Sequence, residues 1–196
     1  MTHPIYVLDT ETSTTHFKPY IDGHIVEIGI VEVDLERQKA IPFYHSIIND
    51  PKAKEEAWVF NNTTLTMDVM RKGRDKGQIS QYLSHILGGS EVTAFNTSFD
   101  QLMVSRDMKE FDSSIRWGEC LMKDSARIEE IPRKHANSNA YPTAQDTYNH
   151  LCPDDPAGIN GIEEHRAQSD AYMEAFILIE LYNNGLYTPL SDQEGD

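Results

Sequence analysis

The chain has 196 residues, of which 39% are hydrophobic, and it carries a formal net charge of −15. This length and composition fit one globular domain, so we expect a single domain over residues 1–188 and an acidic, flexible tail over 189–196. The negative charge argues against a general polyanion binder, because such proteins usually carry a basic face. It does not exclude a nucleic-acid enzyme whose site is built from carboxylates and metal ions.

Targeting features and the number of cysteines indicate the cellular compartment of the protein. No apolar run approaches the roughly 20 residues of a membrane span, and the amino terminus shows no secretion signal. Two cysteines, Cys120 and Cys152, are too few for a disulfide scaffold or a Cys-rich zinc site. We therefore expect a cytoplasmic protein with no membrane contact.

An apolar run beginning at Ile5 predicts a short buried strand, and two acids, Asp9 and Glu11, follow within it. Because strand side chains alternate between faces, these two carboxylates stand on the same face. They repel each other unless a cation lies between them, and hard divalent ions such as Mg²⁺ prefer oxygen ligands. The same spacing recurs at Asp34 and Glu36 in a polar stretch that predicts a solvated turn, so the spacing alone is a weak signal.

The rest of the chain alternates between predicted strands and helices. We predict strands over 24–34, 39–50, 92–95 and 115–117, and helices over 63–70, 78–87, 97–111, 121–128, 144–151 and 167–182. Short polar links between the first three strands favour antiparallel pairing. Two basic segments, 71–77 and 129–141, are interpreted mainly as solvated loops, with contact to a substrate as the alternative.

Two further acids lie at the start of predicted helices. Apolar residues follow Asp100 at offsets of four, eight and eleven, and follow Asp170 at three, seven and eleven, so each acid heads a core-facing stripe. For Asp100 the alternative is a helix-start acid favoured by the helix macrodipole. His165 precedes Asp170 by five residues, which on a helix is roughly 140° away. We therefore place His165 in the preceding loop, from which it can reach a site that Asp170 helps to build.

Four acids and one histidine thus lie at the ends of predicted core elements: Asp9, Glu11, Asp100, Asp170 and His165. Converging carboxylates suit two-metal phosphoryl chemistry, in which one ion activates water and the other stabilises the leaving oxygen. A neutral histidine can take the proton from that water.

These residues resemble the motifs of the DEDDh 3′–5′ exonucleases, a superfamily with a ribonuclease H-like fold that includes proofreading epsilon subunits, RNase T and oligoribonuclease. The motifs match, in order, Val7–Thr12 (supported by Ile25–Gly29), Asn96–Asp100 and His165–Ala171. Each motif is weak alone, but the three together span most of the chain and form a strong match. Phe95 stands where the family often has histidine, which leaves the subfamily open.

The resemblance implies an α/β fold of the ribonuclease H-like exonuclease type, with a central mixed five-stranded sheet flanked by helices. It implies two bound Mg²⁺ or Mn²⁺ ions, one held by Asp9, Glu11 and Asp170, with Asp9 bridging to the second. Asp100 is expected to act on the ions directly or through water, and His165 to be the general base.

The resemblance also implies substrate contacts from Thr10, Thr12, Asn96 and Phe99. Thr12 is expected to use its backbone, and Phe99 to pack beneath the site. The implied activity is removal of nucleoside 5′-monophosphates from the 3′ end of single-stranded nucleic acid, with DNA slightly favoured over RNA. The alternatives are an exonuclease-fold subunit that serves a polymerase partner, and an α/β domain whose acids are solvated caps. The sequence also leaves open whether the protein forms a homodimer.

Overall fold

The computed structural model describes residues 3–15, 23–133, 140–159 and 165–193. Its centre is a five-stranded sheet in the order β3-β2-β1-β4-β5. The strands are β1 (Ile5–Thr12), β2 (Ile25–Asp34), β3 (Lys39–Ile47), β4 (Glu91–Thr93) and β5 (Arg116–Trp117). β1, β2 and β3 pair antiparallel, whereas β4 and β5 run parallel to β1. The predicted fold class, a mixed five-stranded sheet flanked by helices, is confirmed.

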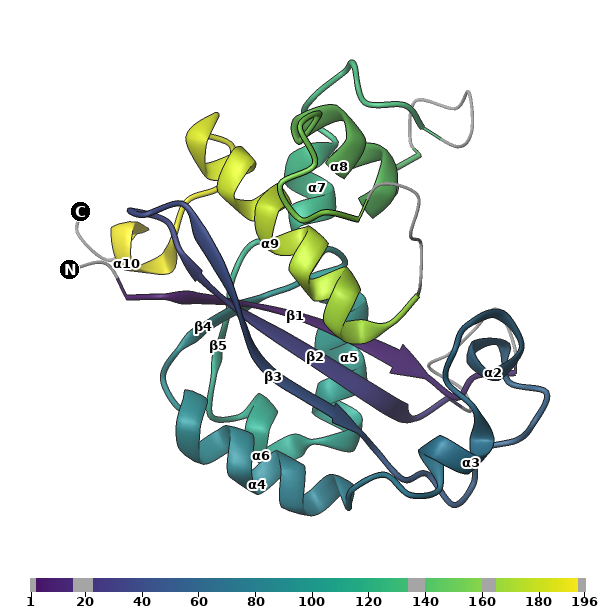
Figure 1. Cartoon of the computed structure of the whole chain (residues 1–196). Coiled ribbons are helices and arrows are strands. Elements are labelled where there is room, and N and C mark those ends of the chain that lie inside the picture. The colour runs from purple at the N-terminus through teal and green to yellow at the C-terminus, as the bar shows by residue number, and fades with distance from the viewer. Residues whose placement is uncertain (1–2, 16–22, 134–139, 160–164, 194–196) are drawn as a thin grey trace.

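Helices cover both faces of this sheet (Figure 1). One face carries α7 (Leu121–Ser125), α8 (Ala144–Leu151) and α9 (Ala167–Asn183). The other carries α4 (Lys76–Leu87), α5 (Thr97–Asp107) and α6 (Lys109–Asp112). The short helices α2 (Trp58–Asn62) and α3 (Met67–Met70) lie near the carboxyl end of β1, and α10 (Leu190–Gln193) lies at the opposite end of the sheet. No helix in the described ranges is both long and apolar enough to cross a bilayer.

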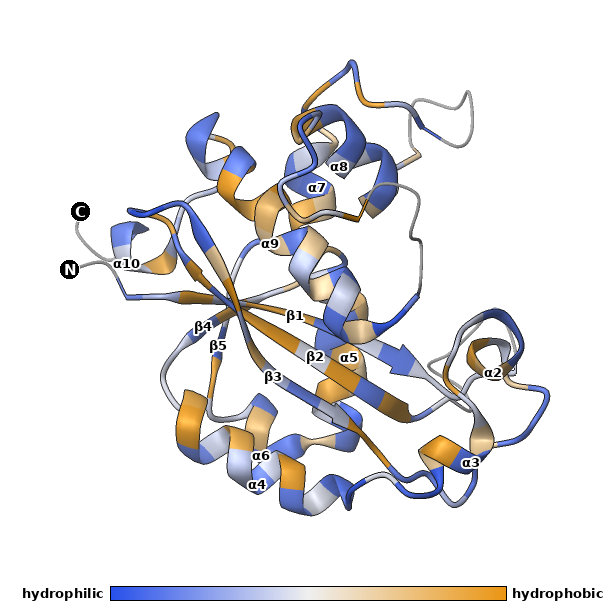
Figure 2. Cartoon of the chain, viewed as in Figure 1, coloured by the Kyte–Doolittle hydropathy of each residue, from blue (hydrophilic) through white to orange (hydrophobic). Residues whose placement is uncertain are grey.

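The alternation of apolar side chains along β1 builds the two cores on either side of the sheet. Val7 packs into the core beneath α9, and Leu8 packs into the core beneath α4 and α5. Figure 2 shows the hydrophobic strands enclosed between these helices and the polar loops outside them. Asp9 and Glu11 follow Val7 at even spacing, so both carboxylates point to the α9 face at the end of the strand.

Gly29 allows α9 to rest directly on the sheet beside this end of β1. Gly29 lies opposite Asp9 in the β1–β2 pairing. A Cβ atom at Gly29 would lie only 2.2 Å from the carbonyl oxygen of Ala167, the first residue of α9. The missing side chain therefore lets the amino-terminal turn of α9, with Asp170, approach Asp9.

Several predicted boundaries differ from the structure. The predicted helix over 63–70 is wrong: α2 ends before it, Thr63 turns the chain by donating its hydroxyl to the Val59 carbonyl, and only Met67–Met70 is helical. The predicted helix over 97–111 breaks at Met108, whose non-helical backbone (φ −135°, ψ 54°) separates α5 from α6. The predicted strand over 39–50 ends at Ile47, after which Ile48 forms an isolated bridge to Arg74 of the basic segment 71–77.

The carboxyl-terminal tail is partly structured. Leu190–Gln193 form α10, and the Leu190 amide donates to Oε2 of the buried Glu91 at 2.8 Å. Residues 194–196 lie outside the described residues, as do Lys134 and His135 of the basic segment 129–141.

Candidate active site

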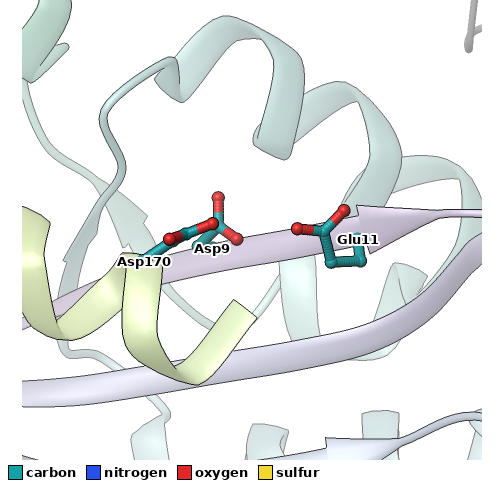
Figure 3. A group of neighbouring side chains, drawn as sticks. All are labelled: Asp9, Glu11 and Asp170. Atoms are coloured by element: carbon teal, nitrogen blue, oxygen red, sulfur yellow. The ribbon is translucent and has the colours of Figure 1, made fainter. Parts of the chain in front are cut away.

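Three carboxylates meet where β1 ends against the start of α9. Asp9 and Glu11 come from β1 and Asp170 from the first turn of α9, and one ligand oxygen of each lies within 4.8 Å of the others. All three side chains are half-buried. Figure 3 shows Asp9 and Asp170 side by side and Glu11 farther along the strand on the same face. We call Asp9, Glu11 and Asp170 the carboxylate cluster.

The electrostatics of the carboxylate cluster favour a cation. Burial, reinforced by the nearby charge of Glu174, raises the pKa of Asp9 well above its ordinary value. Burial, reinforced by Asp170, raises the pKa of Glu11 in the same way. A divalent ion would relieve both effects, and a donor set made only of carboxylate oxygens fits Mg²⁺ or Mn²⁺. These residues therefore fit the metal site that the sequence predicts.

Asp100 lies beside the carboxylate cluster without belonging to it. It sits in the first turn of α5, is only 3% exposed, and accepts a hydrogen bond from the Thr10 hydroxyl at 2.7 Å. Burial raises its pKa to about 7, although the Thr10 hydrogen bond acts in the opposite direction. Its charge also helps to raise the pKa of Asp9. Asp100 is thus close enough to act on the cluster electrostatically.

His165 stands outside α9, in the loop position that the spacing predicts. Its backbone has a φ of +42°, an uncommon conformation for a residue other than glycine. It lines a cavity of about 240 Å³ together with Asp9 and Asp170. Its ring packs edge-on against Trp58, with 5.0 Å between the ring centroids. The structure thus brings His165 to one cavity with Asp9 and Asp170, two of the three residues of the carboxylate cluster.

The four predicted substrate residues lie around this region in different environments. The buried Thr10 directs its hydroxyl to Asp100, so its side chain orients that carboxyl. Thr12 is buried at the end of β1, Asn96 precedes the first turn of α5, and Phe99 is half-buried against the core. Substrate contact by these residues stays a prediction.

The sequence interpretation missed Glu174, which adds a carboxyl group to the same cavity. Glu174 lies one turn after Asp170 on α9, is 4% exposed, and lines the cavity with Asp9. Burial, together with the charges of Asp100 and Asp170, raises its pKa well above the ordinary value. Its Oε2 accepts from the Phe95 amide at 3.2 Å. Glu174 therefore ties α9 to the chain that leads into α5.

A second missed feature is an ion cluster formed by Glu27, Arg166 and His45, which we call the Glu27 ion cluster. Glu27 on β2 is fully buried. The Arg166 guanidinium donates to it through Nη2 at 2.7 Å and Nε at 2.8 Å, and Nε2 of His45 lies 2.6 Å from its Oε1. Burial acts to raise the pKa of Glu27, but the hydrogen bonds from His45 and Arg166 prevail and lower it.

The Glu27 ion cluster fixes the chain next to His165. Arg166 directly precedes α9, and its Nη1 also donates to the Thr64 hydroxyl at 2.8 Å. Arg166 therefore links the start of α9 both to β2 and to the segment between α2 and α3. Because His165 is its immediate neighbour, this anchor restricts where the imidazole can lie.

Comparisons with known proteins can be set against this geometry. No family model matches the chain. Exodeoxyribonuclease 10 of Escherichia coli (strain K12) is 27% identical over 183 residues, which cover 93% of this chain and 70% of that protein. The chain is similar to an exodeoxyribonuclease. A crystal structure of a full-length 3′-exonuclease superposes with a TM-score of 0.70 at 12% identity, covering 94% of this chain and 62% of that one.

The exonuclease likeness extends to further solved structures. Escherichia coli exonuclease I in complex with a dA16 oligonucleotide gives a TM-score of 0.62 at 16% identity, over 94% of this chain and 42% of that one. At such identities the structures show a shared fold, and this chain spans less than half of exonuclease I. Together with the sequence relative, which is named an exodeoxyribonuclease, they support the predicted resemblance to the exonucleases.

Proposed function

We propose that this protein is a metal-dependent 3′–5′ exonuclease that removes nucleoside 5′-monophosphates from single-stranded nucleic acid. The observation that carries the proposal is the carboxylate cluster, in which Asp9 and Asp170 line one cavity with His165. The sequence relative is named as an exodeoxyribonuclease, which supports DNA as the preferred substrate. A structural neighbour that recognises the 3′ end of a histone mRNA stem-loop keeps RNA as the alternative.

In this proposal the carboxylate cluster would hold one divalent ion, and Asp9 and the nearby Asp100 would help to hold a second. When bound, such ions supply an activated water and stabilise charge on the leaving oxygen. The protein fixes the carboxylates at the junction of β1 and α9, while Thr10 orients Asp100 by its hydrogen bond.

His165 is the proposed general base. Its imidazole takes a proton from the attacking water, whose oxygen forms the new bond to phosphorus. The bond between phosphorus and the 3′-oxygen of the preceding nucleotide breaks, and that oxygen acquires a proton from solvent. The products are a nucleoside 5′-monophosphate and a strand shortened by one nucleotide with a new 3′-hydroxyl.

The test is a gel assay on matched 5′-labelled single-stranded DNA and RNA, with Mg²⁺, Mn²⁺ or EDTA. We expect a ladder that shortens from the 3′ end only when a divalent metal is present, and faster cleavage of DNA. Asp9→Asn should abolish cleavage, whereas Asp34→Asn, the same change in the second acidic pair, should leave it intact, because Asp34 is the last residue of β2 and accepts hydrogen bonds from Arg37 in the turn that follows.

Two outcomes would contradict this proposal. Retained cleavage by folded Asp9→Asn would show that the carboxylate cluster is not the active site. If folded wild-type protein cuts neither substrate, the alternative of an exonuclease-fold subunit that requires a polymerase or another partner takes its place.

A further inference from the structure

Glu174 is a buried acid in the candidate active site that has no role in the proposed reaction so far. It lies on α9, one turn after Asp170, and only 4% of its surface is exposed. It lines the cavity of about 240 Å³ that also holds Asp9 and His165. Charged side chains are almost never fully buried unless they are paired. A carboxyl group at this position therefore calls for a partner.

The protein offers Glu174 one polar partner. Its Oε2 accepts a hydrogen bond from the Phe95 amide at 3.2 Å. Within the described residues, no positively charged side chain pairs with Glu174, and its second oxygen, Oε1, accepts no hydrogen bond. Arg166, the cation that directly precedes α9, is bound to Glu27 instead. Oε1 is thus the oxygen that Glu174 can offer to the cavity.

The charged neighbours of Glu174 are acids. Burial, followed by the charges of Asp100 and Asp170, raises the pKa of Glu174 well above its ordinary value. After burial, the charge of Glu174 does more than that of any other group to raise the pKa of Asp9. Buried carboxylates that face one another are unfavourable unless a cation compensates them. The position of Glu174 therefore favours a cation between it, Asp9 and Asp100.

We propose that Glu174 helps to bind the second divalent ion, together with Asp9 and Asp100, by holding a water molecule of that ion. This inference rests on the proposed function, which requires the second ion. In the described part of the chain, only Asp9, Glu11 and Asp170 bring ligand oxygens within 4.8 Å of one another, so contact through water fits Glu174 better than direct ligation. Mg²⁺ usually keeps several of its waters, and a carboxylate oxygen accepts hydrogen bonds from such waters.

The hydrogen bond to Phe95 prepares Glu174 for this role. It fixes Oε2 on the backbone just before α5, the helix that carries Asp100. Glu174 itself belongs to α9, the helix that carries Asp170. The same side chain therefore sets the position of Asp100 relative to Asp170 and leaves Oε1 for the water.

Manganese binding tests the inference without relying on cleavage. Free Mn²⁺ gives a sharp electron paramagnetic resonance signal that bound Mn²⁺ does not, so a titration yields the number and the affinity of bound ions. Deoxythymidine 5′-monophosphate, a product of the proposed reaction, would be present throughout. We expect two ions per wild-type chain. In Glu174→Gln the second ion should bind roughly 10- to 100-fold more weakly, which is typical for loss of a group that orients a ligand of the metal, and the first ion should bind as in wild type.

Two further variants separate the charge of Glu174 from its packing. Glu174→Gln keeps the size of the side chain and an oxygen that can accept from the Phe95 amide, so the metal-free variant should unfold at a Tm no lower than that of wild type. Glu174→Asp keeps the negative charge and should bind the second ion more tightly than Glu174→Gln. Glu180→Gln is the matched control, because Glu180 is a half-buried acid on α9 outside the cavity, and it should bind both ions as wild type does.

The failure of this inference can be told apart from failure of the proposed function. If wild-type protein cuts DNA and binds two ions, and Glu174→Gln binds both with wild-type affinity, the role of Glu174 is refuted and the exonuclease proposal stands. If Glu174→Gln weakens both ions alike and lowers the Tm of the metal-free protein, Glu174 is a structural residue and the inference is again refuted. The same holds if Glu174→Asp binds the second ion no better than Glu174→Gln. If wild-type protein binds fewer than two ions, the two-metal proposal and this inference fail together.

Discussion

Removing the positive charge of Arg166 is expected to destabilise the protein strongly. In Arg166→Met the fully buried Glu27 keeps the neighbouring His45 at 2.6 Å but loses the guanidinium donors at 2.7 Å and 2.8 Å. Breaking a buried ion pair from one side costs roughly 3–5 kcal/mol, because the remaining charge stays buried without compensation. Since His45 still contributes, we expect about 3 kcal/mol, which for a chain of this size lowers Tm by roughly 6–12 °C.

Urea and thermal unfolding of four variants would test this reasoning. Arg37→Met is the matched control: its ion pair with Asp34 has a similar distance, 2.9 Å, but the Arg37 side chain is 75% exposed, so we expect a loss of less than about 1 kcal/mol. The double variant Arg166→Met with Glu27→Gln removes both charges and should recover a large part of the stability that Arg166→Met loses. Glu27→Gln alone should also be destabilised, because it leaves the Arg166 guanidinium without its carboxylate.

Activity separates the structural part of this cluster from its effect on His165. We expect the double variant to be stable yet to show a kcat lowered by roughly 100-fold, because small displacements of a catalytic group have effects of that size. Its KM should change little, since Arg166 and Glu27 bind each other and neither is proposed to contact the substrate. A loss of less than about 1 kcal/mol in Arg166→Met, or losses that simply add in the double variant, would refute the reasoning.

Three further predictions concern metal, pH and backbone packing. Mg²⁺ or Mn²⁺ should raise the Tm of wild-type protein but not that of Asp9→Asn, because a bound ion stabilises the folded state. Scanning calorimetry with and without EDTA can show this difference. An equal rise in Tm in both proteins would argue against metal binding at the carboxylate cluster. Burial raises the pKa of Asp100 to about 7, so the folded state holds a proton that the unfolded chain releases near its ordinary pKa of 3.8. Metal-free protein should therefore become less stable as the pH rises from about 4 through 7. Asp100→Asn should reduce this pH dependence of the free energy of unfolding, as urea unfolding at several pH values can show. An unchanged pH dependence would refute the raised pKa of Asp100. Gly29→Ala should push α9 away from β2, since the new Cβ would lie 2.2 Å from the Ala167 carbonyl oxygen. We expect it to cost roughly 1–3 kcal/mol and to lower activity, and wild-type stability would contradict this packing.

Local sequence periodicity predicted the parts of the site that depend on one element at a time. Asp9 and Glu11 share a face because strand side chains alternate. Asp100 and Asp170 could be predicted at helix starts because apolar residues follow each of them at helical spacing. Each of these inferences needs only neighbouring residues.

Features that depend on contacts between distant segments could not be predicted in this way. Arg166 meets Glu27 across 139 positions of sequence, and neither residue alone indicates a partner. Glu174 lies one turn after Asp170, but an acid within an apolar stripe gives no sign of which buried group it faces. The helix α2, which positions Trp58, has only five residues, too few for a periodic signal.

The most direct measurement of the central claim follows both ends of one single-stranded DNA molecule. An oligonucleotide labelled at its 3′-terminal nucleotide and, with a different label, at its 5′ end would be incubated with the protein in Mg²⁺ and the products identified by mass spectrometry. We predict that the 3′ label appears at once as a nucleoside 5′-monophosphate, while the 5′ label stays on strands that shorten one nucleotide at a time. Asp170→Asn and EDTA should each stop the reaction. Release of the 3′ label on longer fragments, or first release of the 5′ label, would contradict the assignment of a 3′–5′ exonuclease.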